Sequence, residues 1–252
     1  ELAEELFDRS SKSGTLTDAG RVLQNYGQRL VRLAEETESA MRELRDLRRG
    51  RVLIGANEAA VHTLLPLMVR FHERLPNIVV DVRRVPARQI AVEVQQGSLD
   101  FGALTFRPAE TGLLEVPVGS DELVLLVPPS HPFSKRRQVS MEDVGHEAIV
   151  AHNDPSPARE RVLRMFEEHH ITLRIVIALP SLDGIKRAVE LKLGLALLPR
   201  RCALTEIADG RLVAVPVAGI SRRRQVTLVC RRAHRSHAAN AFLEIAQEKS
   251  GN

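Results

Sequence analysis

Apolar residues at heptad spacing dominate the sequence between residues 17 and 49. The steps between them alternate between four and three for about four repeats, the pattern of a helix with one apolar seam. Thr17 is a natural N-cap, Asp18 lies in the first turn and Gly50 is a natural stop. The pattern predicts a helix about 45 Å long. Its seam consists of Ala19, Leu23, Tyr26, Leu30, Leu33, Thr37, Ala40, Leu44 and Leu47.

Charged and amide side chains fill the other faces of this helix, so the seam needs a partner. The helix could pack on its own domain, but a 3.5-residue period over this length favours pairing with a second copy. We therefore expect dimerisation through the larger seam residues Leu23, Tyr26, Leu30, Leu33, Leu44 and Leu47.

The segment ahead of the helix consists of two short apolar pieces around a polar turn that contains Gly14. This pattern is typical of a small two-stranded wing. Arg9 and Lys12 lie in it and could contact a phosphate group, although exposed cations are ordinary on any surface.

From residue 50 the pattern alternates between short apolar runs and amphipathic stretches. It predicts strands at 52–55, 78–85 and 100–105, with helices between them at 58–74 and 87–97. Pro66 is expected to break or restart the first of these helices. Alternation at this spacing predicts a parallel sheet with right-handed crossovers.

A second set of elements follows the proline-rich segment 128–132. Its pattern predicts a second α/β unit, and two such units joined in mid-chain indicate two lobes around a cleft. The strands expected beyond the first unit's core are 113–118, 122–127, 148–151, 173–178, 195–198, 212–217 and 225–230, and the helices are 156–170, 181–193 and 238–249.

Composition narrows the class of protein. The chain has 252 residues, 44% of them apolar, which suits one large domain or two small ones. No run approaches the ~18 apolar residues of a membrane span, and no leader opens the chain, so we expect a soluble, cytoplasmic protein. Cys202 and Cys230 stand apart from any His/Cys cluster, which predicts no disulfide and no metal. Because the sequence begins at Glu1, we expect residues to be missing upstream.

The net charge of +4 is concentrated at one end of the chain. Residues 221–252 carry seven basic and two acidic side chains, whereas residues 51–220 carry twenty of each sign. A solvated strand edge explains this excess as well as a nucleic-acid contact does. Charge alone therefore does not decide the function.

Short motifs in a fixed order carry a family resemblance. They are Leu6-Phe7-Asp8-Arg9, Leu16-Thr17-Asp18-Ala19-Gly20, Arg51–Gly55, Leu65-Pro66, Phe71…Leu75-Pro76, Gly97-Ser98-Leu99-Asp100-Phe101-Gly102-Ala103-Leu104, His131-Pro132 and Gly194-Leu195-Ala196-Leu197-Leu198-Pro199. Each motif is weak alone, but the ordered set covers nearly the whole chain. It resembles the LysR-type transcriptional regulators.

The resemblance implies an α/β fold in which a long linker helix, following a winged helix-turn-helix, leads to a bilobed effector domain like the type II periplasmic binding proteins. We expect residues 1–16 to be the remnant wing and residues 17–49 the dimerisation helix. Lobe I is then expected at 50–124 and 225–252, and lobe II at 125–224.

The same resemblance implies what the protein binds. The partners would be a small-molecule effector (a small organic acid or metabolite), a second copy in homodimers and homotetramers, and double-stranded DNA in the intact protein. Roughly 40 residues with the base-reading helix-turn-helix would precede Glu1. This chain is thus expected to retain dimerisation and sensing but not sequence-specific DNA binding, and Arg9 would touch phosphate.

Helix N-termini at the cleft are the natural place for an effector, because their N–H groups and dipoles favour anions. Arg159 is the best-placed cation. One alternative is that Ser156 and Ser181 only cap their helices. A second alternative is a neutral or amine-bearing effector, because Glu58 adds a carboxylate and Ala59 and Ala87 stand where relatives that sense acids often carry Ser or Thr. The candidate residues are Asn57, Glu58, Ala59, Ala60, Thr105, Phe106, His152, Asn153, Ser156, Arg159 and Ser181.

Catalysis finds little support in the sequence. A glycine-rich phosphate loop and a nucleophile elbow are both missing, and the adjacent His169 and His170 would point about 100° apart on a helix. We therefore expect no enzyme activity and no cofactor. The alternative function from another class is a solute-binding protein for transport, which the two lobes alone would also suit.

Overall fold

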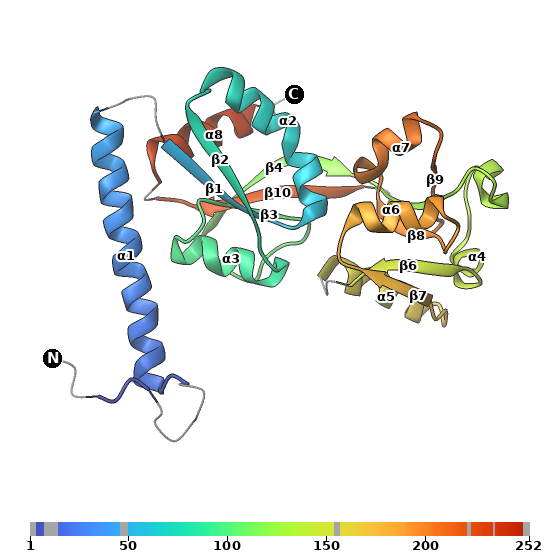
Figure 1. Ribbon diagram of the computed structural model, residues 1–252, viewed down its shortest axis with the longest axis horizontal. Coiled ribbons are helices and arrows are strands. Elements are labelled where there is room, and N and C mark those ends of the chain that lie inside the picture. The colour runs from blue at the N-terminus through green and yellow to red at the C-terminus, as the bar shows by residue number, and fades with distance from the viewer. Residues whose placement is uncertain are drawn as a thin grey trace.

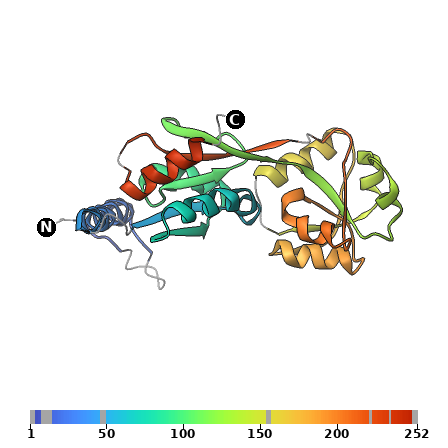
Figure 2. The same cartoon turned by 90° about the horizontal axis from the view of Figure 1, so that it is seen from above.

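The computed structural model describes residues 4–7, 15–45, 50–153, 157–220, 223–233 and 235–248. A long helix, α1 (Asp18–Arg45), stands beside a body made of two lobes (Figure 1). Viewed from above, the helix and the two lobes lie in a row (Figure 2). None of the helices in the described part of the chain is long and apolar enough to cross a membrane.

Helix α1 confirms the heptad prediction in its described part. The hydroxyl of Thr17 accepts a hydrogen bond from the N–H of Gly20 (3.0 Å), so Thr17 caps the helix as expected. Among the seam side chains that the structure describes, Leu23, Tyr26, Leu30 and Leu33 are exposed, with Leu30 at 68% and Leu33 at 60%. Ahead of the helix, Phe7 and Leu16 form one antiparallel bridge. Arg9, Lys12 and Leu47 lie outside the described residues, as does the side chain of Leu44.

The first lobe is built on a five-stranded sheet in the order β2-β1-β3-β10-β4. Helices α2 and α8 cover one face and α3 covers the other (Figure 1). The strands are β1 (Gly50–Ala56), β2 (Ile78–Arg84), β3 (Phe101–Leu104), β4 (Leu113–Asp121) and β10 (Arg224–Arg231). The helices are α2 (Glu58–Arg74), α3 (Ala87–Gln96) and α8 (His237–Glu248).

The predicted parallel pairing of the first three strands is confirmed, because β1 runs parallel to both β2 and β3. The complete sheet is mixed, since β10 runs antiparallel to both β3 and β4 as the chain returns from the second lobe. The expected break in the first helix is wrong, because α2 continues through Pro66. Pro66 is exposed while Leu64 and Leu67 beside it are buried, so the missing hydrogen bond lies on the solvent side, where a helix tolerates it best.

The second lobe contains two small sheets. One is antiparallel, in the order β8-β5-β9, and the other pairs β6 with β7 in parallel. The strands are β5 (Leu123–Val127), β6 (Ala148–His152), β7 (Arg174–Leu179), β8 (Ala196–Pro199) and β9 (Val213–Val215). The main helices are α5 (Pro157–Glu168) and α6 (Leu182–Glu190).

Four short helices in this lobe were not predicted: η1 (Pro132–Lys135), α4 (Met141–Gly145), η2 (Arg200–Ala203) and α7 (Leu204–Ala208). For one of these helices, α4, the sequence contains a capping pattern that would have predicted its first turn. Ser140 and Asp143 form a capping box at the start of α4, and hydrogen bonding to the Ser140 N–H holds the pKa of the Asp143 carboxyl below its usual value.

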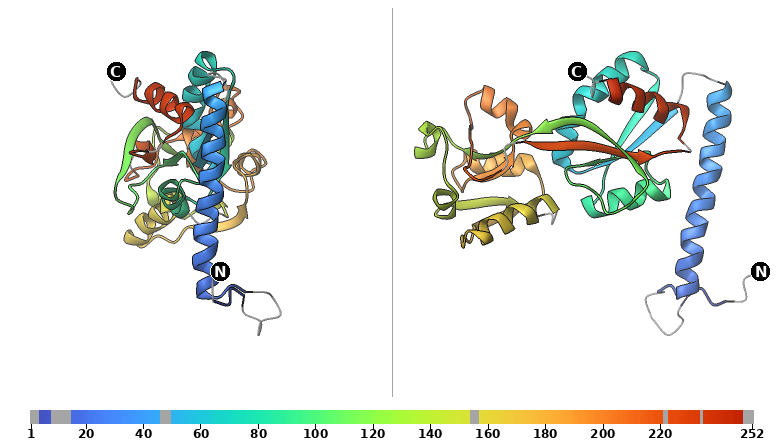
Figure 3. Two further views of the ribbon diagram at one scale, coloured as in Figure 1. Left: turned by 90° about the vertical axis from the view of Figure 1, so that its left-hand side faces the viewer. Right: turned by 180° about the vertical axis from the view of Figure 1, so that it is seen from behind.

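The chain passes between the lobes twice. It crosses first at Glu122, between β4 and β5, and returns from β9 to β10. Strands β4 and β10 are hydrogen-bonded neighbours that run together toward the second lobe (Figure 3, right). A rotation of the lobes would therefore bend both connections at one place.

Each lobe has its own apolar core. In the first lobe, the ring of Phe242 from α8 packs against Phe71 of α2 and Phe101 of β3, with centroids 5.0 and 5.1 Å away. All three rings are fully buried. In the second lobe, strand β5 lies between two clusters, with Leu125 and Val127 facing one and Val124 and Leu126 facing the other.

Candidate ligand-binding site

A cavity of about 150 Å³ lies between the two lobes, and we call it the interlobe cavity. A cavity of this size accommodates a molecule about as large as benzene. The first lobe contributes Asn57, Glu58, Ala59, Arg84 and Ala87 to its wall, and the second lobe contributes Leu123, Ile149–His152, Arg159, Val162, Leu163, Leu173, Ile175, Leu182 and Leu197–Pro199.

Element ends bring the polar residues of this cavity together. Asn57 is the N-cap of α2, and its side-chain oxygen accepts a hydrogen bond from the N–H of Ala60 (2.8 Å). Glu58 is the first residue of that helix. Arg84 is the last residue of β2, and His152 is the last residue of β6. The cavity thus lies beyond the carboxyl ends of parallel strands, the usual place for a ligand in an open α/β sheet.

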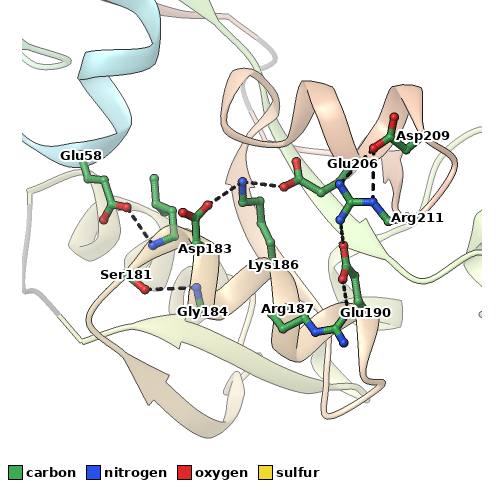
Figure 4. Close-up of polar contacts among 11 residues, drawn as sticks. Glu58, Ser181, Asp183, Gly184, Lys186, Arg187, Glu190, Glu206, Asp209 and Arg211 are labelled. Atoms are coloured by element: carbon green, nitrogen blue, oxygen red, sulfur yellow. Dashed lines mark hydrogen bonds and ion pairs between the residues drawn. The ribbon is translucent and has the colours of Figure 1, made fainter.

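The carboxylate of Glu58 reaches from the first lobe to the second (Figure 4). One oxygen accepts a hydrogen bond from the N–H of Leu182, the first residue of α6 (3.1 Å). The other lies 3.6 Å from Nε2 of His152. A negative charge at the N-terminus of α6 is favoured by the helix dipole. Glu58 is therefore held in place by the second lobe rather than by its own.

Two arginines supply positive charge to the cavity wall. Arg84 comes from the first lobe and Arg159, near the start of α5, from the second. A further contact joins the lobes beside them, because Arg88 of α3 donates to the carboxylate of Glu160 on α5 (2.6 Å). Guanidinium groups bind carboxylates and phosphates through paired hydrogen bonds. With apolar side chains lining much of the rest, the cavity suits a small anion that has an apolar part.

The expected site residues fall into two groups. Asn57, Glu58, Ala59, His152 and Arg159 line the interlobe cavity. The other expected residues that the structure describes do not line the cavity. In the first lobe, Ala60 is buried in the core, Phe106 packs against the cluster under α3, and Thr105 lies just before Phe106, after β3. In the second lobe, the Asn153 N–H donates to the Leu179 carbonyl, and Ser181 is the N-cap of α6, where it accepts from the Gly184 N–H. Ser156 lies outside the described residues.

Sequence reasoning missed Arg84 and the apolar wall from the second lobe. Arg84 had a usable signal in the sequence, because it lies near the carboxyl end of the parallel strand predicted at 78–85, two residues before Pro86, the N-cap of α3. The apolar wall had none, since Leu173, Ile175 and Leu197 read as ordinary strand residues in the sequence.

A second hollow, of about 460 Å³, opens at the crossing between the lobes. Most of its lining residues are charged, and several of them are hydrogen-bonded to one another. Asp121 accepts hydrogen bonds from the N–H groups of Glu122 (2.7 Å) and Arg201 (3.3 Å), and the Arg201 side chain donates to the Ser120 carbonyl (3.1 Å). These bonds join the end of β4 to η2, so we assign this hollow to the hinge.

A network of charged side chains links α6 to α7 (Figure 4). Lys186 has a side chain only 9% exposed, and its ammonium lies 2.9 Å from Asp183 and 2.8 Å from Glu206. Burial lowers the pKa of Lys186, but the bonds to the two carboxylates outweigh it and leave the pKa above its usual value. Within the described residues, no group of acidic, histidine or cysteine side chains is arranged to hold a metal ion.

Replacing Lys186 with methionine is expected to lower the free energy of unfolding by about 2–3 kcal/mol. The change leaves the Glu206 carboxylate, 13% exposed, without its ammonium, and breaking a fully buried pair costs about 3–5 kcal/mol. Urea unfolding measures the loss. The double variant Lys186→Met/Glu206→Leu should recover most of it, because no buried charge is left unpaired and the other carboxylate, Asp183, is 89% exposed. Equal stabilities of the single and double variants would contradict this account.

These features define a class: a two-lobed domain that has a cavity between its lobes and follows a long helix with an exposed apolar seam. The sequence profile for the LysR substrate binding domain matches residues 45–251. The chain belongs to the LysR family and is a ligand-responsive transcriptional regulator. Membership decides against the transport protein that two lobes alone would also have suited.

Named relatives agree with this assignment. A "Probable RuBisCO transcriptional regulator" of Trichormus variabilis is 31% identical over 245 residues, which cover 94% of this chain and 73% of the relative. A protein of the same name from Chlorokybus atmophyticus is 32% identical over 250 residues, or 96% of this chain and 80% of the relative.

Solved structures show the same fold. The regulatory domain of Synechocystis CcmR, in complex with 2-PG, superposes with a TM-score of 0.72 at 21% identity and covers 81% of this chain and 99% of that one. CbnR, a LysR family transcriptional regulator, superposes with a TM-score of 0.70 at 17% identity and covers 94% of this chain and 82% of that one.

Proposed function

We propose that the chain senses a small anion in the interlobe cavity and transmits the binding event as a change in the angle between its lobes. The observation that carries this proposal is that Arg84 and Arg159, from different lobes, line one cavity. An anion that contacts both arginines binds better when the lobes are in one relative position, and such differential affinity is what shifts a conformational equilibrium.

The rest of the chain supports the sensing role. The lobes divide near Glu122 and Arg223, where the two crossings meet, and these are the points about which they turn. Residues 1–16 contact DNA phosphate through Arg9 and Lys12 in the intact protein, which works in the cytoplasm on double-stranded DNA. The chain has no enzymatic activity of its own; the cavity binds its effector and releases it unchanged.

The oligomer is built from two apolar surfaces. The seam of α1 pairs two chains, with Leu23, Tyr26, Leu30, Leu33, Leu44 and Leu47 facing the partner. A second surface joins lobes of different chains, and its exposed apolar residues support this: Leu65 and Val69 on α2 and Val79 on the edge strand β2. Effector-dependent rotation of the lobes then changes how dimers assemble into tetramers and bend DNA.

Thermal unfolding of the whole chain with a panel of compounds tests the sensing role. The panel contains small carboxylates, inorganic phosphate and sulfate, 2-PG, amines and neutral metabolites. A compound that binds the native state at a hundredfold excess over Kd adds about 2.7 kcal/mol of stability. Stabilisation by an anion supports the proposal; if only neutral compounds or amines stabilise the chain, the proposed anion chemistry is wrong.

Arg159→Ala is expected to weaken binding of the anion found in that panel by about 10- to 100-fold. The reason is the loss of a charge-assisted hydrogen bond of about 1.5–3 kcal/mol. Isothermal titration measures the change in Kd. Arg164→Ala is the matched control, because Arg164 is an exposed arginine on the same helix that does not line the cavity. Equal losses in both variants would show that only overall charge matters.

A further inference from the structure

Glu58 places a negative charge inside a cavity that otherwise attracts anions. Its carboxylate is fixed by the Leu182 N–H at 3.1 Å and lies 3.6 Å from Nε2 of His152. Both contacts come from the second lobe, so the Glu58 side chain links the two lobes at the cavity wall. The α6 N-terminus is an attractive position for an anion, and Glu58 already occupies it.

The cavity wall therefore carries charge of both signs. Arg84 and Arg159 provide positive charge, and Glu58 provides a carboxylate that accepts hydrogen bonds. An anionic group near the arginines is favoured. A second anionic group near Glu58 is opposed by like charge, because two carboxylates sharing a site cannot both be ionised without cost. A hydroxyl or amine near Glu58 is favoured instead.

We propose that Glu58 determines the charge selectivity of the interlobe cavity. The class of effector it selects is a small acid with one anionic group and, at its far end, a hydrogen-bond donor. This inference rests on the proposed function, since it assumes that the interlobe cavity binds the effector. Glu58 also selects against acids that carry an anionic group at both ends.

Three four-carbon acids test the selectivity: butanoate, 4-aminobutanoate and succinate. They share one carboxylate and differ at the far end, which is a methyl group, an amine or a second carboxylate. Kd is measured by isothermal titration or NMR for the wild-type chain and for Glu58→Gln. The glutamine keeps an oxygen that accepts from Leu182 but removes the charge, so the lobe contact is retained.

In the wild-type chain we expect 4-aminobutanoate to bind more tightly than butanoate, and succinate to bind least tightly. In Glu58→Gln the ratio of the Kd for succinate to the Kd for 4-aminobutanoate should fall at least tenfold. Glu168→Gln is the matched control, because it removes the charge of an exposed carboxylate on α5 outside the cavity, and its ratio should stay unchanged. A purely structural Glu58 would change all three Kd values together.

The failures of the two proposals are distinguishable. If no compound of the larger panel stabilises the wild-type chain, the sensing function itself is wrong. If the wild type responds to an anion but the ratio is unchanged in Glu58→Gln, or if none of the three acids binds to either chain, the selectivity role is overturned and sensing stands. If Glu58→Gln does not fold, Glu58→Ala replaces it, because it also removes the charge. The alanine variant is used only if its own thermal unfolding is cooperative.

Discussion

The variant Leu30→Glu is expected to lose the dimerisation that we propose for the wild-type chain and to be monomeric at the same concentration. Leu30 lies in the middle of the α1 seam and is 68% exposed in the single chain. In a paired helix both copies would be buried, and each leucine contributes about 1.5–3 kcal/mol. Losing two of them, and adding two like charges, should raise the dimer Kd about 1000-fold, which corresponds to ~4 kcal/mol.

Sedimentation equilibrium of the whole chain measures this change. Gln28→Glu is the matched control, since it introduces the same charge at an exposed position of α1 outside the seam. The lobes should keep their own unfolding transitions in both variants, because α1 stands beside them. If Leu30→Glu dimerises as tightly as Gln28→Glu, the α1 seam is not the dimer contact.

Phe242→Ala is expected to cost the first lobe about 3–5 kcal/mol of stability. The ring is fully buried and packs against both Phe71 and Phe101, so its removal loses transfer free energy and leaves a cavity between α8, α2 and the sheet. No rearrangement of small side chains can fill the space of an aromatic ring without shifting these elements.

Urea unfolding measures this loss of stability. Because each lobe has its own core, the loss should shift the unfolding transition of the first lobe. Phe7→Ala serves as the comparison, since Phe7 is 58% exposed and its replacement should change stability by less than about 1 kcal/mol. A loss of similar size in both variants, or a loss confined to the second lobe, would refute this description of the core.

Local signals in the sequence predicted the elements that local chemistry determines. The period of the α1 seam, the Thr17 cap, the Ser181 cap and the stop at Gly97 each depend on residues a few positions apart. Gly97 adopts φ = 82°, a conformation that ends a helix and favours glycine. Such features are readable because the interacting groups are neighbours in the chain.

The local sequence patterns do not predict contacts between segments that are far apart in the chain. Glu58 bonds to the N–H of Leu182, which lies 124 positions away, and nothing in either local pattern pairs them. The position of β10 between β3 and β4 has the same cause, because the pattern of a strand does not state which strands it will join. The sequence thus predicted that helix N-termini form the site, but the polar contacts within the site could be identified only from the three-dimensional structure.

The return of the chain from the second lobe has a consequence for synthesis on the ribosome. Strand β10 holds β4 to the rest of the first lobe's sheet, yet it is made about 100 residues after β4. The second lobe is complete in sequence by then and can fold first, while the five-stranded sheet of the first lobe must wait for the last part of the chain. A chain that ends just before residue 224 would therefore contain every strand of the second lobe, while β3 and β4 of the first lobe would lack the strand that lies between them and would leave apolar sheet edges open.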